Sequence, residues 1–190
     1  MIPRPRCVPC NRPMSFDGSY WRQVRDRGVI HRVRIRCVRC PSCRSRHAVL
    51  PEFVLARRLD SADTIGAALA IEAGAPGAES RAHLLGTVPE RTVRSWMTRF
   101  ADRAPLLGVG LASLAVHWGG PALLPDRDPI VGAVTALGAT WWTSVNRHPW
   151  RPLLPPWRFA CWITGGEFMS TRVDLPWLGG HVPPIPARGP

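Results

Sequence analysis

The stretch from Ile30 to Cys43 reads I-H-R-V-R-I-R-C-V-R-C-P-S-C, and it decides the fold of the first third of this 190-residue chain. Its first ten residues alternate between apolar and polar or basic side chains, a pattern typical of a half-buried β-strand. The apolar set is predicted to face inward and the three arginines outward. The inward positions are Val33, Ile35 and Cys37, and the outward positions are Arg32, Arg34 and Arg36.

Two cysteine pairs of identical spacing accompany this strand. Cys7 and Cys10 form one C-x2-C knuckle, Cys40 and Cys43 form another, and 29 residues lie between them. A two-residue spacer lets both sulfurs of a tight turn reach one ion, and two turns complete the tetrahedron that zinc prefers. A domain of about 50 residues has too small a core to fold on burial alone, so a metal would be required. The sequence therefore predicts a β zinc ribbon over residues 1–57, with Zn²⁺ on these four cysteines.

Two further residues leave the ligand set open. Cys37, Cys40 and Cys43 together read C-x2-C-x2-C, which is the opening of an iron–sulfur run whose fourth cysteine and proline are missing here. Cys37 also keeps the phase of the strand, so it is interpreted as a buried thiol, with ligand exchange as the alternative. His47 is interpreted as a surface histidine rather than a substitute ligand.

The positive charge is concentrated near the start of the chain. The formal net charge is +12, and residues 1–58 contain 14 arginines against three carboxylates. All 25 basic residues are arginine; a GC-rich genome would explain the missing lysines but not the clustering. Charge of this size and sign is typical of proteins that meet nucleic acid or an acidic surface, and the arginine fork suits phosphate and guanine.

Residues 58–104 are predicted to form three helices in a helix-turn-helix. Asp60 is expected to cap the first, whose apolar stripe contains Ile65 and Leu69, and the second is expected over residues 78–85. Thr87 and Glu90 of T-V-P-E are interpreted as a capping box that satisfies free backbone amides before the third helix.

The third helix is predicted to combine an apolar stripe with a polar, basic face. Val93, Trp96, Met97 and Phe100 form the stripe, and Arg91, Arg94, Ser95 and Thr98 form the polar face. In a helix-turn-helix such a helix enters the major groove. An ordinary helical bundle with a solvated arginine face is the alternative. The ribbon arginines Arg32, Arg34 and Arg36 would contact phosphates, and the helix residues would contact base edges.

The segment R-C-P-S-C-R-S-R-H-A-V-L-P, followed by L-L-G-T-V-P-E-R-T-V-R-S-W, resembles the front end of bacterial insertion-sequence transposases. It also resembles stand-alone actinobacterial-type proteins of unknown function that keep the same ribbon and helix-turn-helix. The resemblance covers about residues 5–104 and places Arg91, Thr92, Arg94 and Ser95 at the base-facing start of the recognition helix. Transposases need three metal-binding carboxylates. The acids after residue 104 are Asp126, Asp128, Glu167 and Asp174, in a region too short for the nuclease fold.

Residues 105–178 are predicted to form a mainly helical region rich in proline and tryptophan, and residues 179–190 to be disordered. The uncharged stretches 106–124 and 129–146 contain glycine and hydroxyl residues. These favour helices that pack against the helix-turn-helix or pair two subunits over a membrane hairpin. Tryptophans such as Trp150 and Trp157 are interpreted as hydrophobic cover rather than base-stacking platforms, and Cys161 as a buried thiol.

The fold class predicted is thus small α+β, and the function is sequence-directed binding of double-stranded DNA. No phosphate-binding loop or hydrolase motif is found, so no enzymatic activity and no small-molecule substrate are expected. No secretory signal is visible, which predicts a cytoplasmic, nucleoid-associated protein. Two alternatives remain open: an RNA-binding or protein-docking ribbon module, and an inactive transposase remnant.

Overall fold

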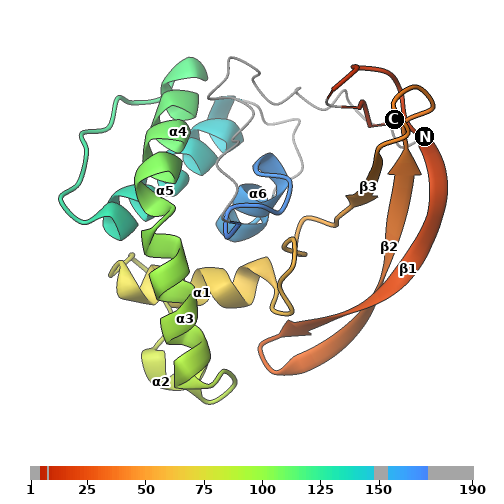
Figure 1. Ribbon diagram of the computed structural model, residues 1–190. Coiled ribbons are helices and arrows are strands. Elements are labelled where there is room, and N and C mark those ends of the chain that lie inside the picture. Colours follow the sequence, from red (N-terminus) through yellow and green to blue (C-terminus); the bar gives the residue numbers. More distant parts are fainter. Residues whose placement is uncertain (1–4, 8, 148–153, 171–190) are drawn as a thin grey trace.

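A computed structural model describes residues 5–7, 9–147 and 154–170 of the chain (Figure 1). The predictions for Trp150, Asp174 and residues 179–190 lie outside these ranges. A three-stranded antiparallel sheet of order β1-β2-β3 comes first, and helices follow it. The predicted α+β class is confirmed.

The sheet consists of β1 (Ser15–Asp26), β2 (Val29–Arg39) and β3 (Arg46–Val49), and β1 and β2 form a long curved arm beside the helices (Figure 1). The alternation predicted for β2 is confirmed from Arg32 to Cys37. Ile35 and Cys37 are buried and Val33 is half-buried, whereas Arg32, Arg34 and Arg36 are exposed. Outside this stretch the pattern differs, because Ile30 is exposed and Val38 is buried beside Cys37. β1 contains an irregularity between Phe16 and Ser19, next to Gly18 at φ +87°, and its pairing with β2 resumes at Ser19 opposite Arg36.

The tip of the arm is fixed to the helices. The N–H of Arg25 donates to the carbonyl of Leu59 (2.6 Å), and the N–H of Ser61 donates to the carbonyl of Arg25 (2.8 Å). Asp26 Oδ1 accepts hydrogen bonds from the hydroxyls of Ser61 (2.7 Å) and Thr64 (3.0 Å). A Cβ placed on Gly28 would lie 3.6 Å from the Cβ of Thr87, in the turn before α3. The arm and the helices therefore form one connected unit.

Three helices occupy the region predicted to hold them: α1 (Ala62–Glu72), α2 (Arg81–Leu85) and α3 (Glu90–Ala101). The cap predicted for α1 was wrong. Ser61 caps this helix by accepting from the N–H of Thr64 (3.0 Å), because the carboxylate of Asp60 is held in an ion pair with Arg25 (3.0 Å). α2 is shorter than the predicted span 78–85, since Ser80 caps it instead.

The capping box predicted before α3 is also wrong. The N-cap of α3 is Pro89, and no side chain caps the helix. The Thr87 hydroxyl donates to the carbonyl of Leu84 (3.0 Å), which completes the end of α2. Glu90 is the first helical residue rather than the third, so its carboxylate cannot reach back to a free N–H in the way a capping box requires.

The remaining helices are α4 (Ala104–His117), α5 (Pro129–Arg147) and α6 (Pro156–Ile163). α4 and α5 run in the same direction: Gly108 lies against Ala133 near one end, and the side chain of Arg147 reaches the carbonyl of Gly119 (3.3 Å) near the other. The long connection 118–128 returns the chain, so the pair is not a hairpin (Figure 1). Among the described residues, no helix has both the length and the apolar character needed to cross a membrane.

One apolar core joins all the helices. It extends from Leu55 to Met169 and includes the buried side chains of α3, α4, α5 and α6. Trp157 packs against this core, with its indole over Gly66 of α1, as the interpretation of the tryptophans as hydrophobic cover predicted. Cys161 is buried, as predicted.

Candidate metal centre and nucleic-acid interface

The two knuckles have the same backbone hydrogen bonds. In the first, the N–H of Cys7 donates to the carbonyl of residue 12 (2.9 Å) and the N–H of Asn11 donates to the carbonyl of Cys7 (2.7 Å). In the second, Cys40 pairs with the carbonyl of residue 45 (2.9 Å) and Arg44 with the carbonyl of Cys40 (3.0 Å). The residue after the second cysteine has positive φ in both, 50° at Asn11 and 60° at Arg44. Each C-x2-C spacing thus builds one copy of the same turn.

These turns bring the four predicted cysteines together. The Sγ atoms all lie within 4.8 Å of one another, and the pairs Cys7–Cys43, Cys7–Cys10 and Cys10–Cys40 are each 3.4 Å apart. Four thiolates at about 2.3 Å from a tetrahedral zinc ion would stand about 3.8 Å apart, so the cluster has the right size. Cys7 and Cys40 are buried, Cys10 is half-buried and Cys43 is exposed. Four cysteines so placed can hold one metal ion.

The hydrogen bonds within the cluster give its thiols different pKa values. The hydroxyl and N–H of Ser45 and the thiol of Cys7 lower the pKa of Cys43 to about 6. The N–H groups of Cys43 and Ser42 lower the pKa of Cys40, while the thiols of Cys40, Cys7 and Cys43 raise the pKa of Cys10 to about 12. Backbone and hydroxyl donors aimed at the second knuckle favour its charged form, which is the form that binds metal.

The two alternative ligands lie outside the cluster. Cys37 is a buried free thiol on the inner side of β2, and it is not part of the group that the structure brings together. His47 is exposed, and its Nε2 lies 3.3 Å from the hydroxyl of Ser45. Ser45 in turn lies 3.0 Å from Cys43 Sγ. Sequence reasoning missed Ser45, although its position two residues after the last knuckle cysteine puts it in the same turn.

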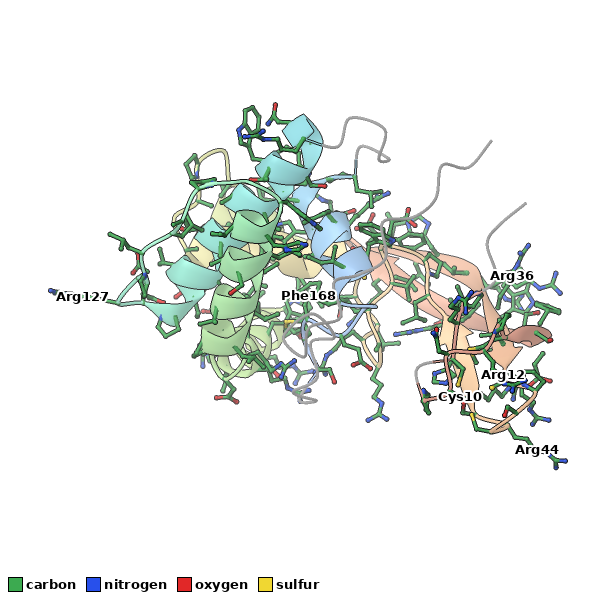
Figure 2. All side chains as sticks on the ribbon, turned by 90° about the horizontal axis from the view of Figure 1, so that it is seen from above. Cys10, Arg12, Arg36, Arg44, Arg127 and Phe168 are labelled. Carbon is green, nitrogen blue, oxygen red and sulfur yellow. The ribbon has the colours of Figure 1, made fainter. Side chains whose placement is uncertain are left out.

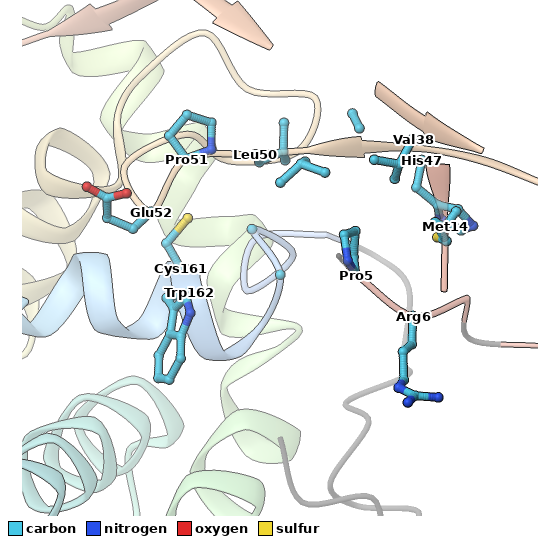
Figure 3. A pocket seen from close by; sticks show the side chains of 14 residues that line it. Pro5, Arg6, Met14, Val38, His47, Leu50, Pro51, Glu52, Cys161 and Trp162 are labelled. Carbon is cyan, nitrogen blue, oxygen red and sulfur yellow. The ribbon is translucent and has the colours of Figure 1, made fainter. Parts of the chain in front are cut away.

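The metal end of the arm has only a small apolar core. It consists of Met14 and Val38 with Cys7, Cys40 and part of Cys10. A cavity of about 380 Å³ lies between this end and α6. Figure 3 shows its lining, with Met14 and His47 on the side of the sheet and Cys161 and Trp162 on the side of α6. The apolar cluster around the four cysteines is therefore separate from the helical core.

The predicted phosphate-contacting arginines lie along the outer face of β2. Arg32, Arg34 and Arg36 are exposed, and within the described residues none of them forms an ion pair. The carboxylate of Asp17 forms ion pairs with two other arginines, Arg39 and Arg46. Figure 2 shows Arg12 and Arg44 at the same end as Cys10 and Arg36, with Arg127 at the opposite end. Sequence reasoning did not select Arg12 or Arg44, because both belong to the knuckles.

The predicted base-facing residues share the outer side of α3. Arg91, Arg94, Ser95 and Thr98 are exposed, Thr92 is half-buried, and Val93, Trp96 and Phe100 are buried on the other side. The Glu90 carboxylate lies 3.6 Å from Arg94 and 3.5 Å from Arg81 of α2. Arg81 is a residue that sequence reasoning missed. The helix set and the β2 set thus lie on separate elements, and the turn at the tip of the arm, at Gly28, lies next to Thr87 before α3.

Comparison with known proteins gives a match to a family model. Residues 7–96 match a family described as "Domain of unknown function (DUF6431)", and this span includes both knuckles, the sheet, α1, α2 and the first half of α3. No curated protein and no solved structure matches significantly.

Proposed function

We propose that this protein binds double-stranded DNA through a zinc-stabilised ribbon and a helix-turn-helix. The observation that carries the proposal is the attachment of two exposed arginine sets to one frame, one set on β2 and one on α3. Under this proposal, one duplex that contacts both elements would meet both sets. The net charge of +12, concentrated in residues 1–58, supports the same class of partner.

Zinc is the proposed metal. Four sulfur donors in a tetrahedral arrangement select zinc or iron–sulfur chemistry. The iron–sulfur run is incomplete, and Cys37 is a buried free thiol outside the group of four cysteines. A closed four-thiolate site has no open position for a substrate, so its role would be structural.

The proposed recognition unit is α2, the turn 86–89 and α3. The α3 helix has 12 residues, which at about 1.5 Å each spans roughly 18 Å, and its outer side carries arginine and hydroxyl groups. Its first turns would contact base edges in the major groove, as in the helix-turn-helix geometry. The ion pairs of Glu90 with Arg81 and Arg94 would hold both guanidinium groups near the start of this helix.

The proposal predicts different effects for the two arginine sets. Arg94→Ala is expected to weaken binding to a preferred duplex by about 1–3 kcal/mol and to change binding to other sequences little, since a base contact carries specificity. Arg34→Ala is expected to weaken binding to all duplexes and to reduce the salt slope by about one. Arg127→Ala is the matched control, because this exposed arginine lies at the far end of the molecule.

The test is a selection of preferred sequences from random duplexes by the zinc-loaded chain, followed by salt-titrated anisotropy with the three variants. Equal losses for Arg94→Ala on every sequence would remove the base-reading role of α3. Stronger binding to structured RNA than to duplex DNA would favour the RNA-binding alternative. Absence of binding to any nucleic acid would favour an inactive remnant or a protein-docking module.

A further inference from the structure

An exposed tryptophan lies in the middle of the basic face of the arm. Trp21 of β1 stands opposite Arg34 in the strand pairing, and 56% of its surface is exposed. The guanidinium carbon of Arg32 lies 4.8 Å from the centre of its ring, so one face of the indole carries a stacked cation. An indole that leaves more than half of its surface in water gains little from burial, which makes a purely stabilising role weak.

The surroundings of Trp21 are uniformly favourable to a polyanion. Between the pairs Ser19–Arg36 and Gln23–Arg32, the outward positions of β1 and β2 contain three arginines and no carboxylate. The Nε of Arg34 donates to the hydroxyl of Ser19 (2.8 Å), which holds this guanidinium beside the indole. Gln23 is exposed on the same face and offers an amide for the edge of a base.

We propose that this face binds unpaired DNA bases next to a duplex, with one base stacked on Trp21 and the adjoining phosphates held by Arg32, Arg34 and Arg36. The inference rests on the proposed function and deepens it, because it changes the preferred ligand from a blunt duplex to a duplex with a single-stranded extension. A base inside a duplex is already stacked on both sides, so only an unpaired base presents its face to an indole. Aromatic side chains within a basic groove are the usual means of holding single strands.

The experiment compares three labelled DNAs with the full, metal-loaded chain. They share one duplex and differ in having no extension, a short thymidine extension, or an abasic extension of the same length and charge. The thymidine extension is expected to raise affinity about 5- to 150-fold over the abasic one, since stacking of one base on an aromatic contributes a factor of that size. The abasic extension reports the phosphate contribution alone.

Variants locate the effect. Trp21→Ala is expected to abolish the difference between thymidine and abasic extensions, and Trp21→Phe is expected to keep most of that difference. Trp142→Ala is the control, because this residue of α5 is also exposed, at 61%, but lies on the helical body. Far-UV circular dichroism and the zinc content establish that each variant is folded.

The outcomes separate this inference from the proposed function. Duplex binding with equal affinity for thymidine and abasic extensions would overturn the stacking role and leave the duplex-binding proposal intact. A preference for thymidine extensions that survives Trp21→Ala would place the single-strand site elsewhere. Failure to bind all three DNAs would overturn both.

Discussion

Removal of the metal is predicted to unfold the knuckle end of the arm and to leave the helices folded. Among the residues that the structure describes, the apolar core at that end contains Met14 and Val38 besides cysteines, and their burial contributes about 3–6 kcal/mol at ~1.5–3 kcal/mol each. Ordering the two turns, residues 9–14 and 40–45, costs about 12 kcal/mol at the lower value of ~1 kcal/mol per residue. A structural zinc ion contributes about 10–16 kcal/mol, enough to reverse that deficit.

The helices and the tip of the arm do not depend on this contribution. The helical core extends from Leu55 to Met169 without any residue of the knuckles. Val24, Ile35 and Val54 form a third apolar cluster near the tip, and the hydrogen bonds of Asp26 hold the tip to α1. We therefore expect hydrogen exchange to accelerate in residues 9–14 and 40–45 after chelation, and to remain slow in the helices.

Cysteine alkylation followed by mass spectrometry gives the sharpest readout. After chelation, Cys7, Cys10, Cys40 and Cys43 are expected to react with iodoacetamide. Cys161 serves as the internal control. Burial raises its pKa to about 12, and it should stay unreactive until denaturant unfolds the helical core. Alkylation of Cys161 at the same rate as the four knuckle cysteines would refute the separation of the two cores. Continued protection of the four cysteines in metal-free protein would refute the need for the metal.

Three further predictions concern single groups. In α1, Gly66→Ala is expected to destabilise the protein by about 1–3 kcal/mol despite better helix propensity, because the new Cβ would overlap the indole of Trp157. Gly138→Ala in α5 is the control, because no described atom outside its own helix turn lies within 4 Å of the new Cβ, and it should stabilise the protein by up to about 1 kcal/mol. If both variants changed the free energy of unfolding in the same direction in denaturant melts, the packing of Trp157 on Gly66 would be contradicted. Ser61→Ala should cost about 1–2 kcal/mol in the same melts, since Ser61 caps α1 and also donates to Asp26; an unchanged midpoint would remove that role. Zinc affinity should fall as pH falls, because protons compete for the thiolates, and it should fall more steeply below pH 6, where Cys43 also becomes protonated. A competition titration showing the same dissociation constant at pH 5.5 and 7.5 would contradict the thiolate site.

Sequence periodicity predicted the elements that have one apolar, buried face and one polar, exposed face. The alternation of β2 from Arg32 to Cys37 and the apolar stripe of α3 were predicted correctly, because each of these stretches has one face on a core and the other in water. The C-x2-C spacing predicted the four-cysteine cluster, since spacing within a tight turn fixes where both sulfurs point.

Periodicity failed where tertiary contacts decide. β1 has no regular alternation, because the irregularity after Phe16 changes its phase and Trp21 lies exposed on the arm. Asp60 is a residue type that often caps helices, but its carboxylate forms an ion pair with Arg25, which belongs to a strand distant in sequence. The docking of the arm tip on the turn before α3 also joins residues far apart in the chain, and local sequence contains no signal for such a contact.

The arm also sets a distance. β2 has 11 residues, which at about 3.3 Å each gives a contour length of roughly 36 Å along the curved strand, comparable to one turn of duplex DNA. Because one end is hydrogen-bonded to α1 and the other carries the sulfurs, this span would act as a ruler between two contact points. Lengthening both strands by two residues keeps every side chain on its own face and moves the far contact by roughly 6.6 Å, or about two base pairs. A one-residue insertion in β2 would instead move the arginines on one side of the insertion to the inner face of the strand. Relatives with longer arms should therefore differ by even numbers of residues per strand and should contact sites with wider spacing.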